Sequence, residues 1–275
     1  MVSGEKEVTP LPAATVALVR DASTGPEVLL LQRSFRAGFM PGVHVFPGGM
    51  LDEGDASPDL HALCLGPDDG AASRALGIAS GGLAYWVAAI RETFEEVGIL
   101  LAYAAGGDVL KLDGDAAERY RAHRREVDQG RSGLTEMTRA EGIRLATDRL
   151  IYFSHWITPE GAPRRYDTRF FLAIAPGEQP AEPDNREAID HTWIRPERAL
   201  ESYQRKEIKL RTPTLKTLER FAGYASVDAL VAELRNERDI PALLPRVGKD
   251  GRNLLPGDPG YEEAGAPAAR GAWRP

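Results

Sequence analysis

Cysteine is almost absent from this sequence, since Cys64 is the only one among 275 residues. One cysteine excludes an intrachain disulfide framework and a zinc site built from cysteine ligands, and it favours a reducing compartment. An excess of positive charge is also missing: 34 Lys and Arg stand against 41 Asp and Glu, and the net charge is −7. This balance argues against a protein that coats nucleic acid or lies on an anionic membrane surface.

Long hydrophobic runs are missing as well. No stretch approaches the about 18 consecutive apolar residues that indicate a transmembrane helix. Residues 1–12 alternate charge with Gly and Pro and contain no apolar segment typical of a secretory signal. The C-terminal Ala-Trp-Arg-Pro is not a peroxisomal address. We therefore expect a cytoplasmic protein that has no membrane or nucleic-acid partner.

The composition otherwise resembles that of a globular protein, with 43% hydrophobic and 27% charged residues. We expect a flexible N-terminus over residues 1–10 and one elaborated domain over residues 11–239. Twelve of the 36 residues from Ile240 onward are Pro or Gly, so residues 240–275 are predicted to form an extended or disordered tail.

Strands and helices are predicted in an irregular order. Turn-bounded apolar runs predict strands over 14–19, 27–32, 151–157, 168–173 and 191–194. Helical periodicity and terminal signals predict helices over 83–97, 115–128, 134–141, 196–203, 213–222 and 227–237. Because regular βαβ alternation is missing, the class is α+β, or α/β with a mixed sheet. Residues 56–82 and 104–148 are expected to be helical insertions, the first of them outside the core.

Three glutamates on the helix predicted over 83–97 are the most informative feature. On a helical projection, Glu92, Glu95 and Glu96 form an arc separate from the apolar stripe of the same helix. Clustered carboxylates suit a hard divalent cation such as Mg²⁺. A solvated acidic helix face is the alternative interpretation, and the glutamates alone do not exclude it.

The surrounding residues resemble the Nudix hydrolase signature. That signature runs Gly, five residues, Glu, seven residues, and then Arg-Glu-apolar-x-Glu-Glu-x-Gly-apolar. Here Gly49 is followed after five residues by Asp55, and Arg91-Glu92-Thr93-Phe94-Glu95-Glu96-Val97-Gly98-Ile99 supplies the second half. The chain departs from the pattern at Asp55 and Thr93 and by a gap of 35 residues before Arg91.

The long gap and the residues upstream resemble the Nudix motif 19 branch, whose members are acyl-CoA and CoA diphosphatases. Gly42 through Gly49, ending Phe-Pro-Gly-Gly, and Arg33 match the CoA-type upstream pattern. The second arginine of that pattern falls on Gly38, with Arg36 two residues away.

The resemblance implies specific roles for the box residues. Glu92, Glu95 and Glu96, helped by the Gly49 carbonyl, would hold Mg²⁺ (or Mn²⁺). Glu92, or as second choice Glu95, would take the proton of the attacking water. Arg91 would pair with Asp55 or with a box glutamate, and a plain surface pair with Glu95 is the alternative.

The resemblance also implies residues outside the helix. Glu187, six residues before Trp193, matches the position of an additional acid, with Asp55 as another candidate, although a solvated loop acid is an equal alternative for Glu187. Candidate substrate-binding residues are Arg33, Arg36, Gly48 and Arg165, and each arginine has an ordinary surface role as its alternative. Trp156, Phe170 and Phe171 are interpreted as core residues rather than as adenine-stacking residues.

The implied fold is a mixed β-sheet sandwiched between α-helices. The implied reaction is hydrolysis of the diphosphate bond of CoA or acyl-CoA, which gives 3′,5′-ADP and (acyl-)4′-phosphopantetheine. The alternatives are a diphosphatase for NADH, ADP-ribose or a nucleotide sugar, and a Nudix module that senses a ligand without catalysis. The expected partner is a small CoA-like nucleotide. A homodimer is compatible with the sequence, which does not decide the oligomeric state.

Overall fold

The computed structural model describes residues 8–35, 41–129, 133–184, 186–248 and 251–264. Its strands are β1 Leu11–Ala22, β2 Gly25–Arg33, β3 His44–Val45, β4 Gly48–Met50, β5 Ala102–Tyr103, β6 Arg144–Leu145, β7 Ile151–Ile157, β8 Tyr166–Ile174, β9 Ala188–Ile194, β10 Ala242–Leu243, β11 Arg246–Val247 and β12 Asn253–Leu254. Its α-helices are α1 Pro58–His61, α2 Asp69–Leu76, α3 Leu83–Val97, α4 Gly114–Asp128, α5 Leu134–Ala140, α6 Pro196–Gln204, α7 Thr212–Phe221 and α8 Val227–Asn236, and its 3₁₀ turns are η1 Glu53–Ala56 and η2 Thr147–Arg149.

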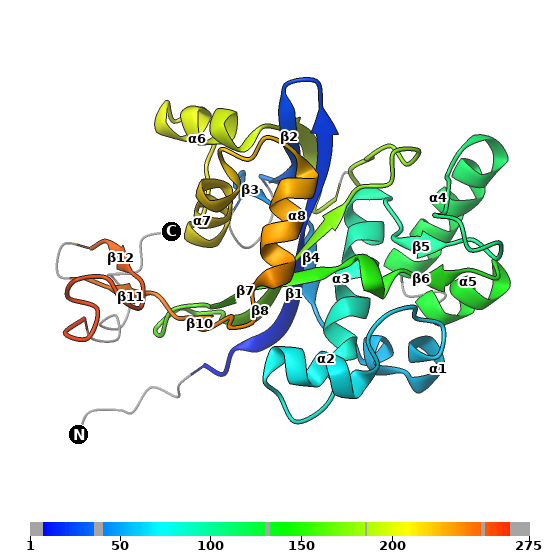
Figure 1. The fold of residues 1–275 in the computed structure, drawn as a ribbon, viewed down its shortest axis with the longest axis horizontal. Helices are drawn as coiled ribbons and strands as arrows, with labels where there is room; N and C mark the ends of the chain where they lie inside the picture. Colours follow the sequence, from blue (N-terminus) through cyan, green and yellow to red (C-terminus); the bar gives the residue numbers. More distant parts are fainter. Residues whose placement is uncertain (1–7, 36–40, 130–132, 185, 249–250, 265–275) are drawn as a thin grey trace.

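A mixed sheet forms the middle layer of the molecule. Its main path runs β10-β7-β8-β1-β2-β3, with β4 paired to β1 and β9 paired to β2. The β1–β8 and β10–β7 pairs are parallel, and the other pairs of this sheet are antiparallel. Helices lie on both sides of it (Figure 1), which confirms the predicted sandwich.

The two faces of the sheet follow from alternation along β1 and β2. Val16 and Leu18 face a core shared with helices α2 to α5. Ala17 and Val19 face a second core shared with α6, α7 and α8. Since both faces are covered, the central strands are apolar at nearly every position, as the sequence of residues 14–19 shows.

Helix α3 begins and ends at the residues predicted from the sequence. Gly98 ends it in the left-handed conformation, with φ 72°, and donates its N–H to the Phe94 carbonyl over 2.9 Å. Asp69 holds the beginning of the helix, because its carboxylate accepts from the N–H groups of Gly81 (3.0 Å) and Leu83 (3.1 Å).

The insertion over residues 56–82 was expected to lie outside the core, and this expectation is wrong. Leu60, Ala72 and Leu76 are buried in the same core as α3. Short helices α1 and α2 produce this burial, because each presents only one or two apolar side chains to the core, too few to give a visible periodicity. The insertion therefore supports the helix that carries the glutamates.

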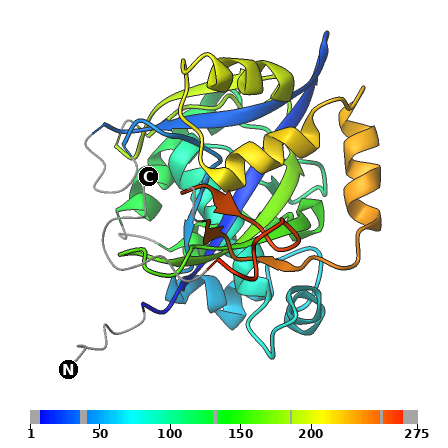
Figure 2. The same ribbon diagram turned by 90° about the vertical axis from the view of Figure 1, so that its left-hand side faces the viewer.

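The chain after residue 240 contributes to the sheet. Strand β10 pairs in parallel with β7, and β11 pairs with β12 in a small separate hairpin. Leu243 and Leu255 pack against the core beneath α7 and α8. Figure 2 shows this hairpin (red) in front of the sheet and beside the beginning of α7. The sheet thus extends past the expected domain boundary at residue 239.

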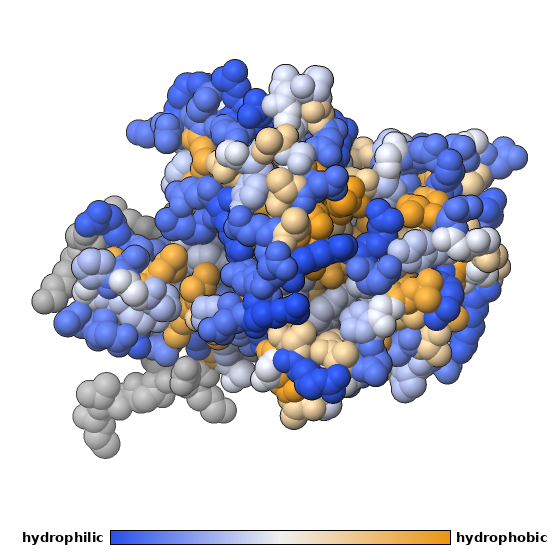
Figure 3. Space-filling view, in the orientation of Figure 1, coloured by the Kyte–Doolittle hydropathy of each residue, from blue (hydrophilic) through white to orange (hydrophobic). Residues whose placement is uncertain are grey.

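The face shown in Figure 3 is mostly hydrophilic, and its apolar atoms lie in small separate patches. The longest helices of the described ranges, α3 and α4, have 15 residues each. Neither of them, nor any other described helix, has the length and apolarity that spanning a bilayer requires.

Candidate active site

Arg91 is the centre of a buried ionic network at the middle of α3. Its Nε and Nη2 each donate to Asp55 over 2.9 Å. Its Nη1 donates to Glu92 (2.8 Å) and to Glu95 (3.1 Å), and Nη2 also reaches the Met50 carbonyl at 2.8 Å. The predicted pairing of Arg91 with Asp55 or a box glutamate is confirmed, and the i,i+4 contact with Glu95 exists alongside it.

Asp55 joins the network across the long gap in the sequence. Its side chain is 1% exposed and also accepts from the Asp52 backbone N–H over 2.7 Å. The 3₁₀ turn η1 positions it, since Asp52 and Asp55 form a reciprocal capping box there. The two halves of the motif are therefore adjacent in the fold, although the insertion separates them in the sequence.

The third glutamate of the helix, Glu96, points to a different partner. It is 6% exposed, and its carboxylate accepts the Gly48 N–H over 2.9 Å. Neighbouring Gly49 packs so closely on the helix that a Cβ there would clash with the Glu92 carboxylate. The side chains of Glu92 and Glu95 are 15% and 17% exposed. The interpretation as a solvated acidic face is therefore wrong.

We refer to Asp55, Glu92, Glu95 and Glu96 as the carboxylate cluster, and burial controls its electrostatics. Burial raises the pKa of Glu95 to about 7, against the opposing charge of Arg91. Burial also raises the pKa of Glu92, and with the charge of Glu92 it raises that of Glu96 well above its usual range. Burial would lower the pKa of Arg91, but its bonds to the cluster raise it above its ordinary value.

The donor chemistry of the carboxylate cluster fits a hard divalent cation. Three carboxylates, of Asp55, Glu92 and Glu95, surround the Arg91 guanidinium, and that of Glu96 lies buried beside them. All four offer oxygen ligands, which Mg²⁺ and Mn²⁺ prefer. As the side chains stand, no three described His, Cys, Asp or Glu residues form a closed ligand set. Arg91 holds Glu92 and Glu95, while Gly48 holds Glu96, so a ligand set requires these side chains to turn.

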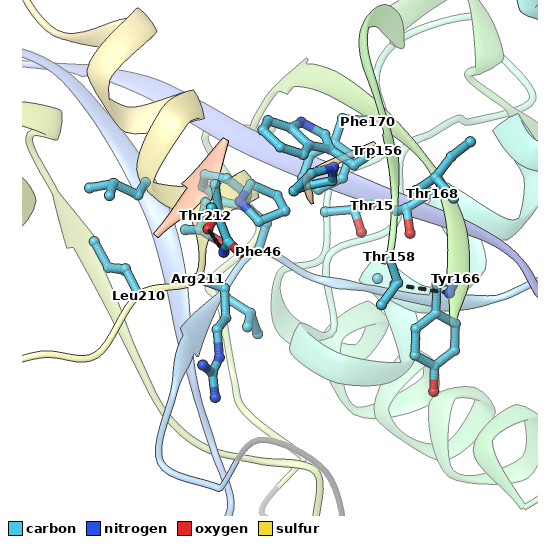
Figure 4. A pocket seen from close by; sticks show the side chains of 18 of the residues that line it. Thr15, Phe46, Trp156, Thr158, Tyr166, Thr168, Phe170, Leu210, Arg211 and Thr212 are labelled. Carbon is cyan, nitrogen blue, oxygen red and sulfur yellow. Dashed lines mark hydrogen bonds between the residues drawn. The ribbon is translucent and has the colours of Figure 1, made fainter. Parts of the chain in front are cut away.

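An open cleft lies beside the cluster and meets it at Gly48. Its volume is about 430 Å³, and its lining comes from β1, β2, β7, β8, the beginning of α7 and the chain after residue 244. Figure 4 shows Phe46, Trp156 and Phe170 on its apolar walls and Arg211 and Thr212 at another side. Trp156 and Phe170 are buried core residues as interpreted, and they also line the cleft.

Two of the four residues predicted to bind substrate line this cleft. Gly48 and Arg33 are both there, and the charge of Arg33 also acts on Glu96. Arg36 lies outside the described residues. Arg165 is not among the lining residues of the cleft: it is 4% exposed, and its guanidinium donates to the carbonyls of Thr158 (3.1 Å) and Val8 (3.0 Å). The expectation for Arg165 is corrected, because the side chain ties the N-terminal segment to the β7–β8 hairpin.

Glu187 lies at the same end of the sheet as Arg33. Its carbonyl accepts the Ser34 N–H over 2.8 Å, and the following Ala188 is in register with Arg33. Its charge raises the pKa of both Glu92 and Glu96. The structure therefore brings the predicted additional acid into electrostatic range of the carboxylate cluster.

Sequence reasoning missed two arginines near the site. Arg124 of α4 donates from Nε to the Glu95 carbonyl and from Nη1 to the Glu182 carbonyl, each over 2.8 Å. Arg211 lines the cleft just before α7. Neither arginine lies in a recognisable motif. The sequence Arg211-Thr212-Pro213 indicates that a helix begins there, but it does not indicate a binding role for Arg211.

A family model described as the NUDT19 Nudix domain matches residues 4–78 and 68–221 of the chain. The chain is 33% identical to the acyl-coenzyme A diphosphatase NUDT19 of Gallus gallus, over 86% of this chain and 73% of that protein. It is 34% identical to the protein of the same name from Homo sapiens, over 87% of this chain and 73% of that one.

A solved structure supports the fold. The crystal structure of a NUDIX hydrolase from Alicyclobacillus acidocaldarius superposes with a TM-score of 0.70 at 24% identity, covering 82% of this chain and 96% of that one. The arrangement around Arg91 also follows the family signature on both sides of the insertion. Together with the match to the family model, these findings show that the chain belongs to the NUDT19 family of Nudix hydrolases.

Proposed function

We propose that this protein hydrolyses the diphosphate bond of CoA or acyl-CoA, releasing 3′,5′-ADP and 4′-phosphopantetheine or its acyl derivative. The observation that carries the proposal is the buried carboxylate cluster around Arg91, which opens beside an apolar cleft. The acyl-coenzyme A diphosphatases of Gallus gallus and Homo sapiens, aligned over most of this chain, support the choice of substrate.

Hydrolysis of a diphosphate requires neutralised phosphate oxygens and an activated water molecule. Mg²⁺ or Mn²⁺, held by Glu92, Glu95, Glu96 and the Gly49 carbonyl, would supply both when bound. Glu92 is the first choice and Glu95 the second for accepting the proton of the water, because their carboxylates are partly exposed. Glu96 is less suited to this task, since it is buried against Gly48.

The remaining residues orient the reacting groups. Arg91 fixes Glu92 and Glu95 relative to Asp55, so that a change at either end of the network moves the glutamates. Arg33 faces both the cleft and Glu96, where a guanidinium suits a phosphate oxygen. Glu187, which directly precedes β9, is the additional acid of the site, because its charge acts on Glu92 and Glu96.

A product-resolved assay tests this function. The purified protein is incubated with Mg²⁺ and, separately, with CoA, an acyl-CoA, NADH, ADP-ribose and a diadenosine polyphosphate, and the products are identified by mass spectrometry. We expect 3′,5′-ADP and a phosphopantetheine to appear fastest, from CoA or acyl-CoA. Faster cleavage of NADH or ADP-ribose would indicate a different nucleotide substrate, and no product from any compound would indicate a sensing module.

A further inference from the structure

The cleft beside the carboxylate cluster has a wall that comes from the end of the chain. Pro245 and Asn253 both line it, although they lie more than 20 residues beyond the last residue matched by the family model, residue 221. Pro245 and Asn253 thus bring the chain beyond α8 to one side of the cleft.

This wall is fastened at several points. Asn253 Nδ2 donates to the Thr212 hydroxyl over 3.1 Å, which joins β12 to the beginning of α7. Tyr261, itself buried, donates its hydroxyl to the Leu244 carbonyl over 2.8 Å. The guanidinium of Arg246 lies 4.4 Å from the centre of the Tyr261 ring. These contacts close the hairpin on itself and hold it against the cleft.

The cleft also presents unpaired polar hydrogens beside its apolar walls. Nε1 of Trp156 and Nε of Arg33 and of Arg211 are buried and have no hydrogen-bond partner in the described part of the chain. Buried N–H groups are rarely left unpaired, because each costs about 1–3 kcal/mol. Unpaired donors that line an open cleft therefore indicate a ligand that carries acceptor oxygens.

The two halves of CoA differ in polarity and charge. The pantetheine half is a largely apolar arm with two amide carbonyls, whereas the adenosine half carries a 3′-phosphate dianion. Arg33 and Arg211 also line the cleft, but a dianion placed among Phe46, Trp156 and Phe170 would lose much of its hydration, which is costly. A hollow beside Glu95 is instead lined mostly by charged residues, four arginines and four acids.

We infer that Pro245 and Asn253, the C-terminal wall of the cleft, together with Trp156 and Arg211, form the subsite for the pantetheine half of the substrate. This inference rests on the proposed function and adds the orientation of the substrate and the part of the chain that selects it. Among the described residues, no hydrogen bond or ion pair joins Pro245 or Asn253 to the carboxylate cluster. The wall therefore sets affinity for the pantetheine half and leaves the chemical step unchanged.

Inhibition by the two products separates the halves of the substrate. The variants are a truncation after Leu244, which keeps β10, and Asn253→Ala. The matched control is Asn236→Ala, an exposed asparagine on α8 whose side chain donates to the Ala232 carbonyl. For each protein, inhibition constants for 4′-phosphopantetheine and for 3′,5′-ADP are measured together with KM and kcat for CoA, and thermal unfolding verifies the fold.

We expect the truncation to raise the inhibition constant of 4′-phosphopantetheine and the KM for CoA at least about tenfold. For Asn253→Ala we expect a rise of about two- to tenfold, the range for one hydrogen bond. The inhibition constant of 3′,5′-ADP and kcat should stay within about twofold in both variants, and Asn236→Ala should resemble the unmodified protein.

Unchanged inhibition by 4′-phosphopantetheine in both variants would overturn the inference, as would a rise for 3′,5′-ADP instead. If the truncated protein does not fold, Asn253→Ala compared with Asn236→Ala decides the question. An unmodified protein that does not cleave CoA would refute the proposed function instead. Calorimetric titration of the unmodified protein and Asn253→Ala with 4′-phosphopantetheine would then still test the subsite.

Discussion

The carboxylate cluster and the cleft meet at Gly48, but they are built from different kinds of residues. In the cluster each carboxylate has a hydrogen-bond partner: Arg91 binds Asp55, Glu92 and Glu95, and the Gly48 N–H binds Glu96. In the cleft the walls are largely apolar, and several buried N–H groups have no partner among the described residues. The first region is organised for one reaction, whereas the second is organised to accept a ligand. Changes in the cluster should therefore reduce catalysis for every substrate, and changes in the cleft should alter selection among substrates.

The largest effect is expected from removal of divalent cations. EDTA should reduce hydrolysis of CoA to background, and added Mg²⁺ or Mn²⁺ should restore it, because the buried carboxylates of the cluster require a compensating charge. Thermal unfolding gives an independent measurement: Mg²⁺ should raise the Tm of the unmodified protein by preferential binding to the folded state. Glu96→Gln should reduce that rise, and full activity in EDTA would contradict the proposed metal site.

Next in size are the glutamates that face the substrate. Glu92→Gln should lower kcat for every substrate by about 10²–10⁴-fold, the usual range for loss of a general base. Glu95→Gln should also lower kcat, to a smaller degree. The control is Glu178→Gln, an exposed residue paired with Lys111, which should retain full activity. Full turnover by Glu95→Gln would refute the assignment of Glu95 to the metal site.

A change at Asp55 tests whether the network also supports the fold. Asp55→Ala leaves the mostly buried Arg91 without its bidentate partner, so the free energy of unfolding should fall by about 3–5 kcal/mol. Asp59→Ala is the control, because this exposed residue forms a surface pair with Arg139 and should cost at most about 1 kcal/mol. Urea unfolding measures both, and equal losses would show that burial of the network contributes little.

The smallest effect is expected in the cleft. Trp156→Phe keeps an aromatic ring but removes the Nε1 donor, which has no partner in the ranges that the structure describes. KM for CoA should rise by about two- to tenfold, the value of one hydrogen bond, while kcat stays within about twofold. Phe171→Leu is a useful comparison, because Phe171 is buried in the other core and should affect stability more than KM.

The sequence predicts the part of the site that lies on one continuous segment. Helix α3 begins and ends where its periodicity and Gly98 indicate, since those signals are local. The link from Asp55 to Arg91 was also predicted, because a family signature fixes both residues despite the gap between them. The Nudix sandwich follows from the same resemblance and from the apolar strands.

The cleft and the supporting elements could not be predicted in the same way. Trp156, Arg211 and Asn253 come from segments far apart in the chain, and only the folded sheet brings them to one hollow. Arg165 resembles a substrate-binding arginine in the sequence, but burial commits it to backbone carbonyls. The insertion buries single apolar side chains from short helices, so its contribution to the core leaves no periodic pattern.

The division of work between the cluster and the cleft is tested most directly by kcat and KM for CoA in two variants measured side by side. Glu92→Gln should lower kcat at least about 100-fold and leave KM within about threefold. Trp156→Phe should raise KM and leave kcat nearly unchanged. A loss of kcat in Trp156→Phe as large as that in Glu92→Gln, or an effect of Glu92→Gln on KM alone, would contradict the account.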